Sequence, residues 1–149
     1  MNDISELRTH IVALARRLRQ SARTGTEAWT GLMALGVIER AEDRATPTLV
    51  ASELDLRSSN AAQILNTLEQ RGLIERLPDP ADKRRVRLTL TRPGRDLVRD
   101  TRAERDQWLE GAIQECLTEE ERAQLIAAGK LMQRLALSPT LKTAPVKEA

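Results

Sequence analysis

The sequence predicts a mainly α-helical fold with one small β-hairpin. Most of the 149 residues lie in segments whose apolar side chains recur every three or four positions, which is the period of a helix packed on one face. One short stretch, residues 85–90, instead alternates apolar and polar side chains, as a strand does. With 40% hydrophobic and 31% charged residues, the composition is that of a globular chain.

The first helix is predicted over residues 3–23, with Asp3 as its cap and Glu6 completing a capping box. Its apolar residues form a narrow seam at alternating spacings of three and four: Ile4, Leu7, Ile11, Leu14 and Leu18. Such a seam packs either on another chain or on later helices of the same chain, and we favour another chain. Residues 24–26 break this helix, and a largely apolar second helix is expected over 27–42.

The middle of the chain predicts two helices joined by a tight turn. Thr46 followed by Pro47 marks the start of a short helix that ends near Leu54. Ser58 or Ser59 is expected to cap the next helix, which runs to about residue 71 and ends at Gly72. Its inner face is apolar, namely Ala61, Ile64, Leu65 and Leu68, and its outer face is polar, namely Ser59, Asn60, Gln63, Asn66 and Thr67. This arrangement is a helix-turn-helix.

A hairpin with a basic tip is predicted directly after these helices. Residues 73–77 and 85–90 read as strands, and the loop between them is charged and stiffened by two prolines. In the second strand, Val86, Leu88 and Leu90 share one side. Two further helices follow, over 92–116 behind a Thr91 cap and from a Thr118–Glu121 capping box onward. The fold class is therefore a winged helix-turn-helix with a helical dimerisation region.

Positive charge is concentrated in the predicted wing. The chain carries a net charge of only +2, but residues 71–95 hold eight basic and three acidic side chains. Such a local basic patch is the footprint of a nucleic-acid surface, although pairing of Arg84 or Arg85 with Asp79 or Asp82 is the alternative explanation. A helix of this length fits the major groove, where Asn and Gln pair with adenine, and a wing Arg suits the adjacent minor groove. The residues themselves indicate DNA contacts at Ser58, Ser59, Asn60, Gln63, Asn66, Thr67, Lys83, Arg84 and Arg85.

Residues 58–94 resemble the winged-helix core of the MarR (multiple antibiotic resistance regulator) family. The matching segments are LEQRGLIER at 68–76, DPADKRR at 79–85 and LTRPG at 90–94. The resemblance implies a dimeric transcription regulator that reads a pseudo-palindrome. It also implies that Arg84 enters the minor groove, that Asp82 orients this arginine, and that Ser59, Asn60 and Gln63 contact bases. Many members carry a basic residue where Gln63 stands, which would shift affinity here onto the wing, Arg57 and Arg71.

These observations define the expected organisation and partners. Residues 1–24 and 92–137 form the dimerisation region, residues 25–91 the DNA-binding domain, and residues 138–149 a flexible tail. The expected function is a ligand-responsive, homodimeric, cytoplasmic repressor that binds double-stranded DNA. A winged helix that binds proteins and has no specific DNA site is the alternative.

Other chemistries are disfavoured by the composition. A single His and a single Cys provide neither a metal site nor a nucleophile–base pair, and no glycine-rich phosphate loop is present. We therefore expect no enzyme activity, no cofactor and no membrane association. Cys116 is interpreted as a small buried residue rather than a redox sensor. Trp29 is expected first in the core and second in an effector pocket between the two lobes.

Overall fold

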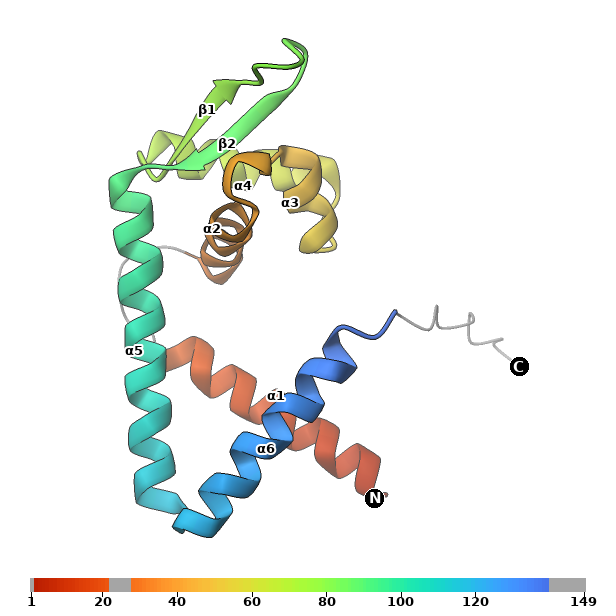
Figure 1. Cartoon of the computed structure of the whole chain (residues 1–149), viewed down its shortest axis with the longest axis vertical. Coiled ribbons are helices and arrows are strands. Elements are labelled where there is room, and N and C mark those ends of the chain that lie inside the picture. Colours follow the sequence, from red (N-terminus) through yellow and green to blue (C-terminus); the bar gives the residue numbers. More distant parts are fainter. Residues whose placement is uncertain (1, 22–27, 140–149) are drawn as a thin grey trace, which may run out of the picture. The chain divides into compact units, whose positions relative to one another are not determined.

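The computed structural model describes residues 2–21 and 28–139 (Figure 1). Tertiary contacts divide the chain into two units, residues 1–108 and 109–149, which are described separately below. The elements in chain order are α1 (Asp3–Ser21), α2 (Trp29–Ala41), the 3₁₀ turn η1 (Glu42–Arg44), α3 (Pro47–Glu53), α4 (Ser58–Gln70), β1 (Ile74–Pro78), β2 (Val86–Leu90), α5 (Arg92–Cys116) and α6 (Glu119–Ala136). The predicted class, mainly α with one hairpin, is confirmed.

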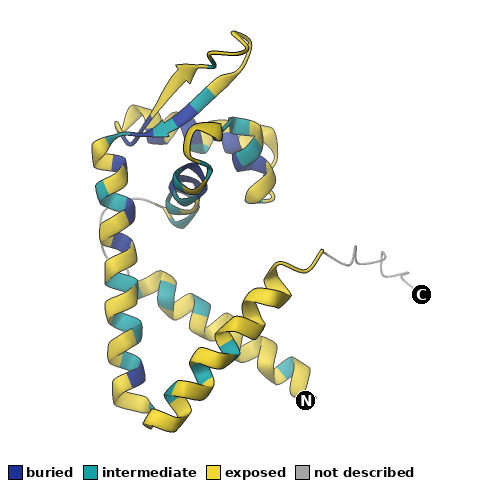
Figure 2. Ribbon diagram, viewed as in Figure 1, coloured by how far each residue is buried: buried dark blue, intermediate teal, exposed yellow. Residues whose placement is uncertain are grey.

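Helices α2, α3 and α4 and the hairpin enclose the hydrophobic core of the first unit (Figure 2). Its largest fully buried apolar side chains are Leu35, Ile38, Leu65, Leu68, Ile74, Leu88 and Val50. Burying each such side chain stabilises the fold by about 1.5–3 kcal/mol. The predicted inner face of α4 is confirmed, because Ala61, Leu65 and Leu68 are buried and Ile64 is half-buried.

Two of the predicted boundary signals for the helix-turn-helix are confirmed. The Thr46 hydroxyl accepts a hydrogen bond from the Leu49 backbone N–H at 3.1 Å, and Pro47 is the first residue of α3. Gly72 follows α4 with a φ of +70°, a conformation that glycine adopts without steric cost. The turn between α3 and α4 contains Asp55 at a φ of +51°.

Two predicted helix caps are wrong by one residue or two. Helix α4 begins at Ser58, so that Arg57 is its N-cap and makes no side-chain cap hydrogen bond. Ser58 and Ser59 instead lie in the first helical turn, where neither occupies the flanking, non-helical position that a cap requires. Helix α1 is capped by Asn2 rather than Asp3, since the Asn2 Oδ1 atom accepts from the Ser5 N–H at 2.9 Å.

The hairpin is an antiparallel pair with Ile74 opposite Leu90 and Arg76 opposite Leu88. The Leu88 N–H also donates to the Ala45 carbonyl at 2.9 Å, which ties β2 to the segment before α3. The predicted alternation of β2 is confirmed at its base, where Leu88 and Leu90 are buried. Val86 is 40% exposed because it lies nearer the tip, beyond the core.

The base of the hairpin is joined to α5 by Thr91 and Gly94. The Thr91 hydroxyl donates to the Gly72 carbonyl at 2.5 Å and accepts from the Gly94 N–H at 3.2 Å, which confirms it as the cap. A Cβ atom on Gly94 would lie 2.0 Å from the Leu73 carbonyl oxygen. Only glycine therefore allows α5 to begin this close to the strand.

In the second unit, α6 opens with the predicted capping box. The Thr118 hydroxyl accepts from the Glu121 N–H at 3.2 Å, and the Glu121 carboxylate accepts from the Thr118 N–H at 2.9 Å. Cys116 is exposed, so its interpretation as a buried residue is wrong. It is the last residue of α5, where the helix no longer packs on a described neighbour that would cover it. The predicted break at 24–26 and residues 140–149 of the predicted tail lie outside the described residues.

Candidate nucleic-acid interface

The outer face of α4 carries the side chains that the sequence singles out for base contacts. Ser59, Asn60, Gln63, Asn66 and Thr67 are all exposed. They project away from the buried face of the helix because residues three and four apart share one side and the core residues occupy the other. The Thr67 hydroxyl donates to the Gln63 carbonyl within the helix at 3.1 Å, so its proton is already engaged.

A cation from the hairpin lies against this face. The Arg76 side chain of β1 donates to the Asn66 Oδ1 atom at 2.9 Å and pairs with the Glu69 carboxylate at 3.1 Å. Sequence reasoning missed Arg76 as a residue of this surface. The signal was present in the strand period, because Arg76 shares a face with the buried Ile74 and so must turn toward the helix.

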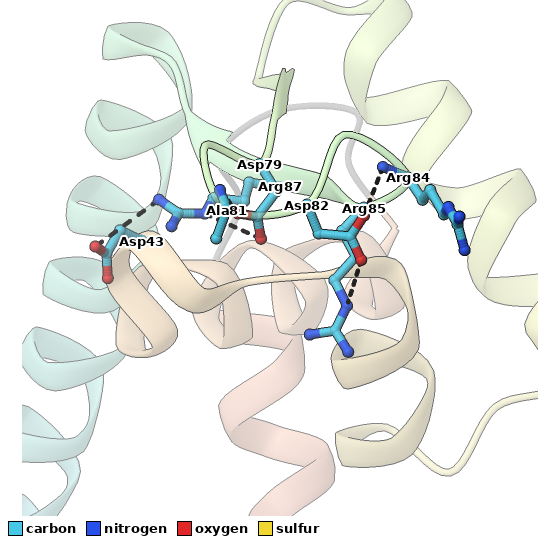
Figure 3. A network of polar contacts seen from close by, with 7 residues as sticks. All are labelled: Asp43, Asp79, Ala81, Asp82, Arg84, Arg85 and Arg87. Carbon is cyan, nitrogen blue, oxygen red and sulfur yellow. Dashed lines mark hydrogen bonds and ion pairs between the residues drawn. The ribbon is translucent and has the colours of Figure 1, made fainter.

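Two aspartates fold the tip of the wing (Figure 3). The Asp82 carboxylate accepts from the Arg84 backbone N–H at 3.0 Å, and the Asp79 carboxylate accepts from the Ala81 N–H at 2.8 Å. The hydrogen bond from Ala81, together with the nearby charge of Arg87, lowers the pKa of Asp79. Asp82 thus holds Arg84 through its backbone amide, and the guanidinium points away from this carboxylate.

The arginines of the wing differ in their surroundings: one is paired at the base of the wing, and the others are exposed at its tip. Arg87 lies 3.7 Å from Asp79 and 3.9 Å from Asp43, and its side chain is only 29% exposed. Arg85 lies 3.9 Å from Asp82 with 72% of its side chain exposed, an arrangement worth little in water. The Arg84 guanidinium has no ion pair within the part of the chain that the structure describes. The base of the wing is therefore fixed while its tip offers unneutralised positive charge.

The wing tip borders the start of α3. A hollow of about 470 Å³ is lined by Thr46, Pro47, Thr48, Arg84, Arg85 and Val86. The remaining predicted contacts frame the same domain. Arg57 is exposed at the start of α4, Arg71 is exposed at its end, and Lys83 is exposed at the wing tip. Which of these side chains touch DNA stays a prediction.

Trp29 is not in the core cluster. It is half-buried at the start of α2, with Arg19 of α1 and Arg105 of α5 at 5.3 and 5.2 Å from the ring centroid. Placement of Trp29 primarily in the core is therefore wrong, because two guanidiniums stack on the ring where apolar neighbours were expected. Among the described residues, no three His, Cys, Asp or Glu side chains gather in a group that could hold a metal ion.

These elements define a winged helix-turn-helix, with α3 and α4 as the helix pair and β1–β2 as the wing. The chain belongs to the MarR family of transcription regulators. The family model matches residues 30–85. Within described residues, no helix is both long and apolar enough to cross a membrane.

Individual relatives agree with this assignment. The chain is 40% identical to a candidate transcriptional regulator of Pseudomonas aeruginosa, with a TM-score of 0.81, over 91% of this chain and 94% of that one. It is 28% identical to the uncharacterized helix-turn-helix-type regulator Mb0904 of Mycobacterium bovis, over 88% of this chain and 90% of that protein. A variant of MepR from Staphylococcus aureus, solved bound to an oligodeoxyribonucleotide, has the same fold at 24% identity, with a TM-score of 0.66 over 91% of this chain and 99% of that one.

Proposed function

We propose that this protein is a sequence-specific, ligand-responsive repressor that binds a pseudo-palindromic operator as a homodimer and has no enzymatic activity. The observation that carries the proposal is the wing tip. Three consecutive cations, Lys83, Arg84 and Arg85, stand there in exposed positions, and their carboxylate neighbour Asp82 is occupied with folding the turn. Charge held in this way is available to a polyanion.

In the proposed complex, α4 lies in the major groove and the wing follows the adjacent minor groove. Base edges are contacted by Ser59, Asn60, Gln63, Asn66 and Thr67. Arg84 enters the minor groove, where a narrow groove concentrates negative potential. Phosphates are contacted by Arg57, Ser58, Arg71, Lys83 and Arg85, and Asp82 maintains the turn. The oligonucleotide complex of MepR supports DNA as the partner.

Dimerisation is supported by apolar side chains left exposed in the single chain. The seam of α1 exposes Ile4, Leu7, Ile11 and Leu14. In the second unit, α6 exposes Ile126, Leu131, Met132 and Leu135. A second copy that covers these faces would bury them, and two recognition helices about 34 Å apart would match one turn of DNA.

The Arg–Trp–Arg stack supports a ligand response. Trp29 joins α1, α2 and α5 through Arg19 and Arg105. A planar anion that replaced one guanidinium on the ring would pair with both arginines. It would also change the contacts that hold α2 beside its neighbours, and so would alter the placement of the DNA-binding helices.

A band-shift titration against the promoter region of the protein's own gene tests the proposal. We expect tight, saturable binding that an unrelated duplex does not compete for, and a log–log salt slope of several units, about −0.9 for each phosphate neutralised. Binding that is salt-sensitive but equal for all duplexes would contradict sequence specificity. Failure to retain any duplex at low salt would favour the alternative, a protein-binding winged helix.

A further inference from the structure

We infer that Arg76 and Asn66 act together as a base-reading pair that presents only hydrogen-bond donors and selects guanine at one position in each half-site. This inference rests on the proposed function, since it assumes that α4 enters the major groove. It adds a specificity role for Arg76, a strand residue outside the recognition helix. It also changes the base that Asn66, on the outer face of α4, is expected to contact from adenine to guanine.

The orientation of the Asn66 amide follows from the chemistry of its partner. A guanidinium carries five N–H donors and no acceptor, so only the Oδ1 atom of Asn66 can face it. That contact is 2.9 Å long. The amide NH₂ group of Asn66 must therefore point away from Arg76, on a side chain that is exposed on the outer face of α4.

This orientation disfavours adenine. An asparagine that pairs with adenine uses Oδ1 as acceptor and Nδ2 as donor at the same time. Here a second donor that approached Oδ1 would meet the N–H groups of Arg76, which have the same polarity. Guanine instead presents two acceptors, N7 and O6, in the major groove. The Asn66 NH₂ group and a remaining N–H of Arg76 can satisfy both.

The ion pair with Glu69 determines whether Arg76 contributes net charge or hydrogen-bond donors to DNA binding. The Glu69 carboxylate lies 3.1 Å from the guanidinium, so the ion pair as a whole carries no net charge. The side chain is also partly buried, at 32% exposed, and is anchored by the strand register that places Arg76 opposite the buried Leu88. Arg76 thus contributes donor geometry rather than net charge, which distinguishes it from the unpaired Arg84.

Selection of bound sequences from a random duplex pool, followed by competition with single-base variants, tests this inference. Wild-type protein should enrich guanine at one symmetric pair of positions, and replacing that guanine with adenine should weaken binding roughly 5- to 150-fold. Asn66→Ala and Arg76→Met should each lose the preference at that position alone. Arg102→Met, which breaks a comparable exposed pair with Glu39, is the matched control and should select the wild-type sequence.

The salt slope separates this role from simple charge or folding effects. Arg76→Met should leave the slope unchanged, whereas Arg84→Met, which removes an unpaired cation from the minor groove, should reduce its magnitude by about one unit. Identical sequence preferences for wild type, Asn66→Ala and Arg76→Met, or enrichment of adenine at the affected position, would overturn the inference while leaving specific DNA binding intact. A wild-type selection without any enriched sequence would overturn the proposed function, and this inference with it.

Discussion

Single side chains in the wing have separate roles that their spacing in the sequence does not reveal. Asp79 and Asp82 close the turn through backbone amides, and Arg87 anchors its base. The family resemblance implies that Asp82 orients Arg84, and the contact between them is a hydrogen bond from the Arg84 backbone N–H rather than from its guanidinium. Arg84, whose guanidinium forms no ion pair among the described residues, is therefore the wing arginine most available to bind DNA.

Arg84→Ala is expected to weaken binding to every sequence with a narrow minor groove beside the half-site. The loss should approach 1–3 kcal/mol and be accompanied by a salt slope lower by about one. Titrations at several salt concentrations measure both. Arg87→Ala is the informative comparison, because Arg87 anchors the base of the wing and its loss should loosen the wing in addition to removing a charge. Equal affinities of wild type and Arg84→Ala for DNA would show that Arg84 does not contact DNA.

Lowering the pH should loosen the wing only at strongly acidic values, where Asp79 becomes protonated. The pKa of Asp79 is lowered by its hydrogen bond from Ala81 and by Arg87, so the ionised form stabilises the fold. That contribution is complete above the ordinary carboxyl pKa, roughly 4, and is lost as the pH falls through the lowered value. An NMR titration should find Asp79 titrating below a solvated carboxylate, and Asp79→Asn should abolish the acid-dependent change at residues 79–82.

At the scale of elements, helix boundaries depend on close backbone contacts. Helix α5 can start where it does only because Gly94 lies against the Leu73 carbonyl. This contact links the strand, the Thr91 cap and the long helix at one point.

Gly94→Ala is expected to destabilise the protein severely, since its Cβ would lie 2.0 Å from a backbone oxygen that cannot move without displacing the strand. Gly129→Ala in α6 is the matched control, because nothing lies within 4 Å of its Cβ and alanine favours helix by about 1 kcal/mol. Urea unfolding measures both. A Gly94→Ala protein as stable as wild type would show that the contact is not a constraint.

The sequence predicts the order and type of the helices and strands, but not the 3₁₀ turn η1. It predicts the bounds of α5 to the residue, because Thr91 marks its start and Pro93 and Gly94 fit its first turn. It does not predict which residue caps α1, since Asn2 and Asp3 are both suitable caps. It does not predict that α4 begins behind Arg57 either, since no capping side chain fixes that start. The surface role of Arg76 and the surroundings of Trp29 are missed for a different reason. Their partners lie on other secondary-structure elements, and only the tertiary fold brings them together.

At the scale of the whole molecule, the proposed binding to a two-half-site operator requires two chains. The α1 seam lacks any buried residue in the single chain, although its spacing is that of a packed helix. Leu7→Glu with Ile11→Glu should therefore yield a monomer at micromolar concentration in sedimentation and reduce affinity for a two-half-site duplex to that for one half-site. Arg16→Gln, a change on the polar face of α1 opposite the seam, should leave the protein dimeric. A wild-type protein that is monomeric under the same conditions would contradict the proposed homodimer.

The most direct test maps where α4 and the wing lie on DNA. An iron–EDTA chelate is tethered to Gln63→Cys or to Lys83→Cys, in a Cys116→Ser background because the native thiol is exposed. We expect cleavage in the centre of each half-site from position 63. From position 83 we expect cleavage in the adjacent minor groove, roughly half a helical turn away on the same duplex. Cleavage from only one of the two positions, or cleavage scattered without register, would contradict a single surface built from the recognition helix and the wing.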